Sequence, residues 1–125
     1  MTLQLNTDQV HVLLAAPLLP GKDEAWRRFT QEMAGWQGCA YVLSRRALGI
    51  TAEWLWLTPA GSVNVAVIAV MAAQPERILG EMVGSERPFD RWFCQQLEVL
   101  LGIEMKRLGA APPERVLTWK EQAMV

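Results

Sequence analysis

The sequence of 125 residues contains few of the residues that make metal sites, disulfide frameworks or nucleic-acid-binding surfaces. It has one histidine, two cysteines (Cys39 and Cys94) and a formal net charge of -1 at pH 7. Two cysteines without a histidine cluster make neither a zinc site nor a disulfide framework, so we expect no metal and two buried free thiols. Twelve basic residues accompany thirteen acidic ones without forming a basic run, which argues against nucleic acid as a partner.

Long hydrophobic runs and cofactor motifs are missing as well. Residues 10–19 are apolar, but no basic residue precedes them and Pro17 interrupts them, so they indicate a strand and a loop rather than a signal peptide. The apolar run at 65–73 is far shorter than the roughly 20 residues that cross a bilayer. A phosphate loop, a dinucleotide fingerprint and a nucleophile elbow are absent from the sequence. We therefore expect a cytoplasmic protein without a cofactor and without a membrane partner.

The residues that are abundant fit one globular domain over residues 1–125. Hydrophobic residues make up 51% of the chain and charged residues 20%. This composition is ordinary, and a chain of this length buries roughly two-thirds of its unfolded surface. Six tryptophans are many for this length, and they need a core, a pocket or an interface to contain them.

A regular apolar stripe predicts a long helix after Pro20–Gly21. Its members are separated alternately by three and four positions: Trp26, Phe29, Met33, Trp36, Ala40, Leu43 and Ala47. The phase continues across Gly35 and Gly38, which favours one long helix, bent at the glycines. Gly49 follows the last member and predicts a left-handed helix end. Arg45–Arg46 lies in the last turn, where cations are favourable, and we expect both side chains to be solvated.

Strands are predicted before and after this helix and near the end of the chain. The expected strands are Gln9–Ala16, Thr51–Thr58, Val63–Val70 and Arg115–Lys120. The second and third are joined by a turn at residues 59–62. Two helices, at residues 75–83 and 88–101, precede the last strand. This order predicts an α+β fold, a ferredoxin-like βαββαβ arrangement with an antiparallel sheet.

The predicted strands are apolar on both faces, although the helices of such a fold cover only one face of the sheet. In residues 63–70 one face carries only valine and alanine, and the other is apolar except for Asn64. In residues 51–58, Trp54 and Trp56 share one face and two leucines share the other. The simplest second cover is the sheet of an identical chain. We therefore expect a homodimer whose sheets pack face to face.

Several short motifs resemble an uncharacterised family of short bacterial proteins. The motifs are Leu48-Gly49-Ile50, Glu53, Trp56-Leu57, Thr58-Pro59-x-Gly61, Pro75-Glu76, Pro88-Phe89-Asp90-x-Trp92-Phe93, Gly102 and Pro113-Glu114. That family is similar to the ferredoxin-like proteins of the dimeric α+β barrel superfamily, which also contains antibiotic-biosynthesis-type monooxygenases. The resemblance implies a dimeric barrel and, if the chain is catalytic, a cofactor-independent oxygenation or isomerisation. Relatives often carry a histidine before the glycine at Gly102, where this chain has Leu101.

Six side chains are candidates for a pocket, and each also has a purely structural interpretation. They are His11, Trp54, Trp56, Asn64, Trp92 and Phe93. The histidine is either a general base in a cavity or a hydrogen-bonded core residue. The tryptophan pair either forms the floor of an apolar pocket or packs in a core or interface. The amide bonds to His11, to a ligand or to groups at its strand end. Within residues 85–93 the aromatic residues either rim a pocket or form the buried side of a helix that begins at Ser85 and Asp90.

Two functions follow from these alternatives. In the first, the dimeric barrel encloses a cavity that binds a small hydrophobic or aromatic molecule. In the second, the dimer is non-enzymatic and acts structurally or by binding another protein, with a filled core and a dry interface. The fold alone does not choose between them, because function depends on the site.

Overall fold

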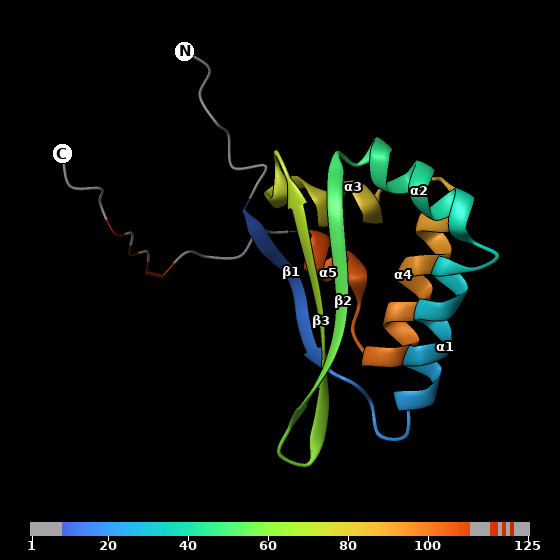
Figure 1. The fold of residues 1–125 in the computed structure, drawn as a ribbon, viewed down its shortest axis with the longest axis vertical. Coiled ribbons are helices and arrows are strands. Elements are labelled where there is room, and N and C mark those ends of the chain that lie inside the picture. Colours follow the sequence, from blue (N-terminus) through green and yellow to red (C-terminus); the bar gives the residue numbers. More distant parts are fainter. Residues whose placement is uncertain (1–8, 111–115, 118, 120, 122–125) are drawn as a thin grey trace.

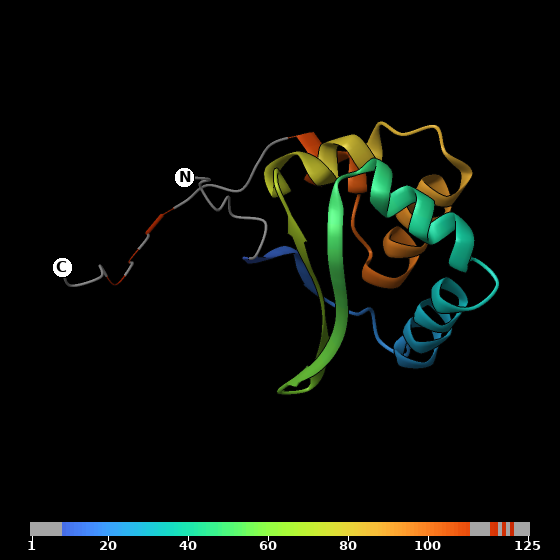
Figure 2. The ribbon, with the colours of Figure 1, turned by 45° about the horizontal axis from the view of Figure 1, so that its top comes forward.

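The computed structural model describes residues 9–110 together with Val116, Leu117, Trp119 and Glu121. The elements in chain order are β1 (Val10–Pro17), α1 (Asp23–Ala34), α2 (Gly38–Ala47), β2 (Ile50–Ala60), β3 (Val63–Ala72), the 3-10 turn η2 (Pro75–Arg77), α3 (Ile78–Val83), α4 (Pro88–Leu101) and α5 (Met105–Ala110). The three strands form an antiparallel sheet in the order β1-β3-β2. The helices lie on one side of this sheet, which gives an α+β architecture of two layers (Figures 1 and 2).

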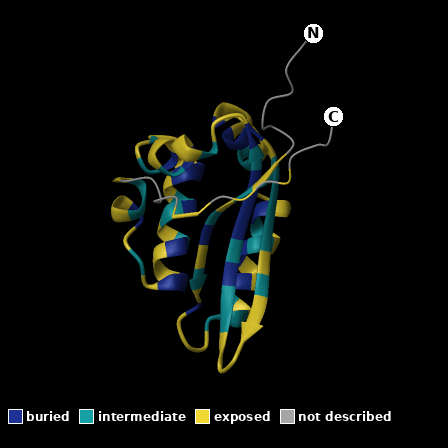
Figure 3. Cartoon of the chain, turned by 90° about the vertical axis from the view of Figure 1, so that its left-hand side faces the viewer, coloured by how far each residue is buried: buried dark blue, intermediate teal, exposed yellow. Residues whose placement is uncertain are grey.

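The first three predicted strands are confirmed, and β2 and β3 form the predicted hairpin. Gly61 provides the positive φ of the turn, and the residues from Thr58 to Val63 are exposed at the hairpin tip (Figure 3). The expectation that the first and third strands are neighbours is also confirmed. A register shift between Val12 and Leu14 marks a bulge in β1.

The prediction of one long helix is wrong, because the chain forms two helices with a turn at residues 35–37. Gly35 has a ψ of -114°, and a Cβ there would lie 3.0 Å from the Gln31 carbonyl oxygen, so glycine avoids a tight contact in this turn. The next N–H groups bond five and three residues back, from Gln37 to Glu32 and from Gly38 to Gly35, which ends the α-helical ladder.

Because of the turn, the residues that the stripe predicts to be buried are not those that α2 buries. In α1 the predicted stripe is buried at Trp26, Phe29 and Met33. Trp36, in the turn, is 76% exposed, and Leu43, beyond it, is 65% exposed. The apolar period therefore continues through the sequence although the helix axis does not, and of the second half of the stripe only Ala40 packs against the core.

The C-terminal helices follow the predicted starts and stops. Pro75 begins the turn before α3, Pro88 is the first residue of α4, and Gly102 ends α4 in a left-handed conformation. Helix α5 was not predicted. The fourth strand, expected at 115–120, lies largely outside the described residues. Its described members are exposed and belong to no strand: Val116, Leu117 and Trp119.

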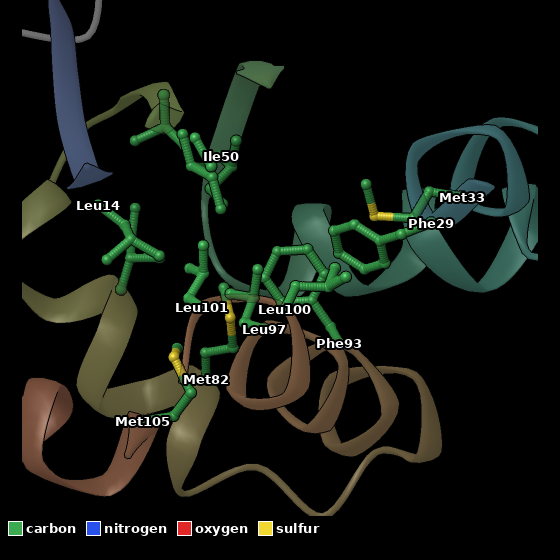
Figure 4. Close-up of a cluster of buried hydrophobic side chains, with 14 of the residues drawn as sticks. Leu14, Phe29, Met33, Ile50, Met82, Phe93, Leu97, Leu100, Leu101 and Met105 are labelled. Atoms are coloured by element: carbon green, nitrogen blue, oxygen red, sulfur yellow. The ribbon is translucent and has the colours of Figure 1, made fainter. Parts of the chain in front are cut away.

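The core lies between the helices and the covered face of the sheet (Figure 4). Phe29 from α1 and Phe93 from α4 are each 1% exposed, with ring centroids 5.4 Å apart. Leu97 and Leu100 extend this contact along α4, and Ile68 closes it from β3. Burying each of these side chains contributes about 1.5–3 kcal/mol, so α1 and α4 are fixed against the sheet chiefly by hydrophobic packing.

Candidate functional site

The strand register assigns each strand residue to one of two faces. On β3, Ala66, Ile68 and Val70 face the helices and are between 0% and 2% exposed. Their cross-strand partners on β2 include Leu55, opposite Ile68, and Glu53, opposite Val70. The alternate residues of all three strands point away from the helices.

We call this second face the open sheet face. It consists of Val10, Val12, Ala15 and Pro17 from β1, of Ala52, Trp54, Trp56, Thr58 and Ala60 from β2, and of Val63, Val65, Val67, Ala69 and Met71 from β3. None of these paired residues is charged. Val12 is 61% exposed and Trp56 is 48% exposed, so described residues leave much of this face uncovered. The prediction that both strand faces are apolar is confirmed.

Trp54 and Trp56 lie on the edge strand β2 of the open sheet face, as neighbours on one side of that strand. Their rings are stacked, with centroids 6.3 Å apart and an interplanar angle of 18°. Across the sheet they pair with Ala69 and Val67. The predicted placement of both indoles on one strand face is confirmed, and they form a continuous aromatic surface that no described helix covers.

His11 lies on the other side of the sheet from the tryptophan pair. It pairs with Val70, whose partner on the opposite side is Glu53, so these three residues share a row on the covered face. Its Nε2 atom is buried, and no described residue forms a hydrogen bond with it. Of the alternatives for Asn64, the bond to His11 is not found in the described structure.

Asn64 instead bonds at its own end of the sheet. Its side-chain amide donates to the Asp23 carboxylate at 2.6 Å, and the main-chain carbonyl oxygen of Asn64 accepts from the Leu18 N–H at 2.9 Å. The amide therefore ties the first turn of α1 to the sheet. This is the structural interpretation of Asn64, with Asp23 as the partner that the sequence did not identify.

Trp92 and Phe93 belong to the helical layer. Phe93 is buried in the core, while Trp92 is half-buried, and its ring lies 5.4 Å from Phe29 and 5.6 Å from Phe89. The six predicted pocket residues are thus divided between the open sheet face, the two ends of the covered face and α4.

A buried polar cluster that the sequence analysis missed joins α2, β2 and α4. It consists of Tyr41, Ser44, Arg45, Glu53 and Asp90. Arg45 is 5% exposed and donates from Nε and Nη2 to the two Glu53 oxygens at 2.8 and 3.3 Å. Tyr41 donates to the same carboxylate at 2.6 Å. The expectation that both arginines of the 45–46 pair are solvated is therefore wrong for Arg45.

Three aromatic rings surround the Arg45 guanidinium. Its central carbon lies 4.4 Å from the Phe93 ring centroid, 5.0 Å from that of Tyr41 and 5.4 Å from that of Phe89. Such contacts between a cation and ring faces are favourable where water is excluded. Burial, with Glu53 beside it, raises the pKa of the Tyr41 phenol above its ordinary value of 10.0, so Tyr41 remains a neutral donor.

Asp90 is completely buried at the start of α4. It accepts hydrogen bonds from Ser44, from Ser85 at 2.6 Å and from Arg87 at 3.0 Å. Burial disfavours the charged form, but the bonds from Ser44, Ser85 and Arg87, with the charge of Arg45 nearby, outweigh it and hold the Asp90 pKa below 3.8. The helix begins at Pro88, and its N-cap residue Arg87 makes no side-chain cap bond, so Ser85 and Asp90 flank the helix entry without capping it. They are bonded to each other, and Asp90 also anchors the buried polar cluster.

An open cleft lies above this cluster, between α2 and the start of α4. We call it the α2–α4 cleft. Its volume is ≈ 480 Å³, and it is lined by Gln37, Ala40, Leu43, Ser44, Arg87, Pro88, Phe89 and Trp92. Of the six predicted pocket residues, Trp92 is the one found here. The lining is mostly apolar, and its polar residues are Gln37, Ser44 and Arg87.

The cysteines offer no reactive centre together. Cys39 is exposed, which corrects the expectation that both thiols are buried, and Cys94 is partly buried beside a second cleft of ≈ 340 Å³. Burial, with Asp90 and Glu98 nearby, raises the pKa of the Cys94 thiol to about 11. A thiol with that pKa carries little thiolate at neutral pH and is a weak nucleophile.

Neither a metal site nor a membrane-spanning helix in the part that the structure describes, nor a known relative, points to a function. Among the described residues, no group of three or more histidine, cysteine, aspartate or glutamate residues is placed to hold a metal ion. No helix in the described part of the chain combines the length and apolar character needed to cross a membrane. No family model, curated protein or solved structure matches this chain.

Proposed function

We propose that this chain works as a homodimer whose open sheet faces pack together, and that the dimer holds a small hydrophobic or aromatic molecule beside Trp54 and Trp56. The observation that carries the proposal is a sheet face without a charged side chain among its paired residues and with large apolar groups exposed. A continuous exposed apolar surface of this kind is often a binding surface.

The dimensions of the open sheet face support this role. Its strands are 8, 11 and 10 residues long. With strands about 4.8 Å apart and a rise of about 3.3 Å per residue, the face has a projected area on the order of 400 Å². A patch of this size matches the largest apolar patch on a typical monomer, which is often a binding surface.

The strand order supports a ferredoxin-like sheet as the unit that dimerises. The order β1-β3-β2, with two antiparallel pairings, agrees with the first three strands of the βαββαβ arrangement. The remaining edge of β1 is where that arrangement places its fourth strand. A fourth strand would widen the open sheet face toward the area that one partner of a stable interface buries, about 800 Å².

The first test is the oligomeric state of the full chain and of two valine variants. Val67 lies at the centre of the open sheet face, whereas Val99 is 55% exposed on α4. We expect the wild type and Val99→Lys to sediment as dimers at micromolar concentration. Val67→Lys places two charges in a symmetric interface and should weaken dimerisation by at least about 100-fold. A wild-type monomer, or an unaffected Val67→Lys dimer, would refute the proposed assembly.

The second test separates ligand binding from simple packing. In a dimer that holds an aromatic molecule, naphthalene quenches tryptophan fluorescence in the wild type. Trp56→Leu reduces the quenching, while Trp36→Leu, at a residue 76% exposed near α2, changes it little. A dimer that shows no quenching would instead support the second candidate function, a non-enzymatic structural dimer. The stacking of Trp54 on Trp56 favours that candidate, since it already satisfies part of their surface.

A further inference from the structure

We infer that the α2–α4 cleft is a binding site for a small amphipathic carboxylate, whose apolar body lies between the helices and whose carboxylate binds Arg87. This site lies in the helical layer, on the other side of the sheet from the open sheet face. The inference therefore does not depend on the proposed dimer or on its ligand.

The shape and lining of the cleft fit the apolar part of such a molecule. Its ≈ 480 Å³ lies within the usual range of small-molecule sites, about 300–1,000 Å³. Leu43 from α2 opposes Phe89 and Trp92 from α4 across the cleft. Leu43 is 65% exposed, so an occupant would cover apolar surface that the described chain leaves in water.

The charge at the rim of the cleft selects an anion. Arg87 is the one charged residue in the cleft lining. Its partner Asp90 is 0% exposed and lies beneath the cleft surface, where three hydrogen-bond donors and the Arg45 charge compensate it. A carboxylate entering the cleft therefore meets a cation and no exposed carboxylate of the lining.

Arg87 is also held in position for this contact. Its Nη1 atom donates to Asp90 at 3.0 Å and to Ser85 at 3.3 Å, while the side chain remains 48% exposed. No hydrogen bond from Nε or Nη2 is formed within the described chain, which leaves one edge of the planar guanidinium available. A guanidinium edge with two parallel N–H donors matches the two oxygens of a carboxylate.

The probes are 2-naphthoate and its neutral analogue 2-naphthamide, titrated into the full chain by calorimetry at millimolar concentration. They share one ring system and differ in charge. We expect 2-naphthoate to bind at least about tenfold more tightly, because only the anion gains the charge-assisted bonds to Arg87. Arg87→Gln should remove this preference and leave the two Kd values similar.

A second pair of variants keeps the test independent of Arg87, which also bonds to the buried Asp90. Leu43→Asp places a negative charge in the cleft lining, and Val42→Asp places the same charge on the adjacent residue, which is 44% exposed and outside the lining. We expect 2-naphthoate binding to weaken by at least about tenfold in Leu43→Asp and to be kept in Val42→Asp.

The outcomes separate this site from the open sheet face. Binding of 2-naphthoate should persist in the Val67→Lys variant, whatever its oligomeric state. The inference is overturned by equal affinity for the two probes, by no binding of 2-naphthoate, or by equal effects of the Leu43 and Val42 substitutions. Loss of binding in Val67→Lys would move the site to the sheet and also overturn it.

Discussion

The two faces of the sheet differ in polarity, and the helix-covered face is the more polar one, although a buried face is usually the more apolar. The face covered by helices carries His11, Glu53 and Asn64, whereas the paired residues of the open sheet face include no charged group. On the covered side, the Glu53 carboxylate has Arg45 and Tyr41 as partners, and Asn64 has Asp23. Glu53 and Asn64 therefore have partners that the chain itself supplies, whereas the buried His11 Nε2 atom has none among the described residues. Apolar groups are left on the face for which the chain supplies no described cover.

The open sheet face is the unusual one, because it exposes large apolar side chains and no charged ones among its paired residues. A monomeric antiparallel sheet typically alternates between apolar residues toward the core and polar residues toward solvent. Here Val67 and Ile68 are consecutive, point to opposite faces and are both apolar. The comparison therefore indicates that both sides of β3 are built for burial.

The largest expected effect comes from placing lysine on each side of β3. Ile68→Lys introduces an unpaired charge into the core and should cost about 5 kcal/mol or more, enough to prevent folding of a marginally stable domain. Val67→Lys should keep the circular dichroism spectrum and cooperative urea unfolding of a folded protein. If both variants are equally unfolded, the open sheet face is as essential to the fold as the covered face, and the comparison fails.

The next largest effect comes from removing one member of the buried polar cluster. Arg45→Met leaves the Glu53 carboxylate buried without its cation, and we expect a loss of about 3–5 kcal/mol in the free energy of unfolding. Urea denaturation gives this value. The double variant Arg45→Met/Glu53→Leu should recover much of the loss, because an apolar pair can replace a buried ion pair. If Arg45→Met is as stable as the wild type, the buried Glu53 carboxylate does not need its cation, and the comparison fails.

A smaller effect is expected from Asp90, and it depends on pH. The folded protein holds the Asp90 pKa below 3.8, so its contribution is present above the ordinary carboxyl pKa and is lost as the pH falls through the lower folded pKa. Asp90→Asn should cost about 2 kcal/mol at neutral pH. The difference from the wild type should shrink in acid, as measured by urea unfolding across the pH range. If the difference in the free energy of unfolding stays constant into acid, the pKa of Asp90 is not lowered by folding.

The smallest expected effect tests the junction where the chain passes from the helices to the sheet. Gly49 has a φ of +76°, and open space surrounds the position of a Cβ. Gly49→Ala should therefore cost about 1 kcal/mol through backbone strain alone. Gly38→Ala is the control, because Gly38 is the first residue of α2 and its Cβ would meet only the Met33 carbonyl, at 3.9 Å. Thermal unfolding should show opposite or clearly unequal shifts for the two variants.

Local signals predicted most of the described fold. Alternation identified the strands, proline marked the starts of η2 and α4, and glycine marked the ends of α2 and α4. The break at Gly35 escaped prediction because apolar periodicity reports spacing along the chain, whereas the direction of a helix axis depends on hydrogen bonds across the turn. Residues 111–115, with much of the expected last strand, lie outside the described structure.

Less of the candidate sites could be predicted from the sequence, because they depend on contacts between elements that are distant in the chain. One signal was available for the buried polar cluster. Glu53 shares a strand face with Leu55 and Leu57, so a carboxylate on that face requires a buried cation. Which cation supplies it, Arg45 or Arg46, depends on the rotation of α2, and that rotation was set by the unpredicted turn. The α2–α4 cleft depends on the same rotation.

The bulge in β1 affects how many copies of this chain can join. An outer strand with a regular ladder is a template to which further strands add without limit, and such addition produces fibres. The register shift between Val12 and Leu14 interrupts that ladder near the middle of β1. Growth along that edge is thereby hindered, whereas the proposed two-fold dimer would cover the apolar face instead. The bulge therefore favours the proposed closed dimer over an open polymer.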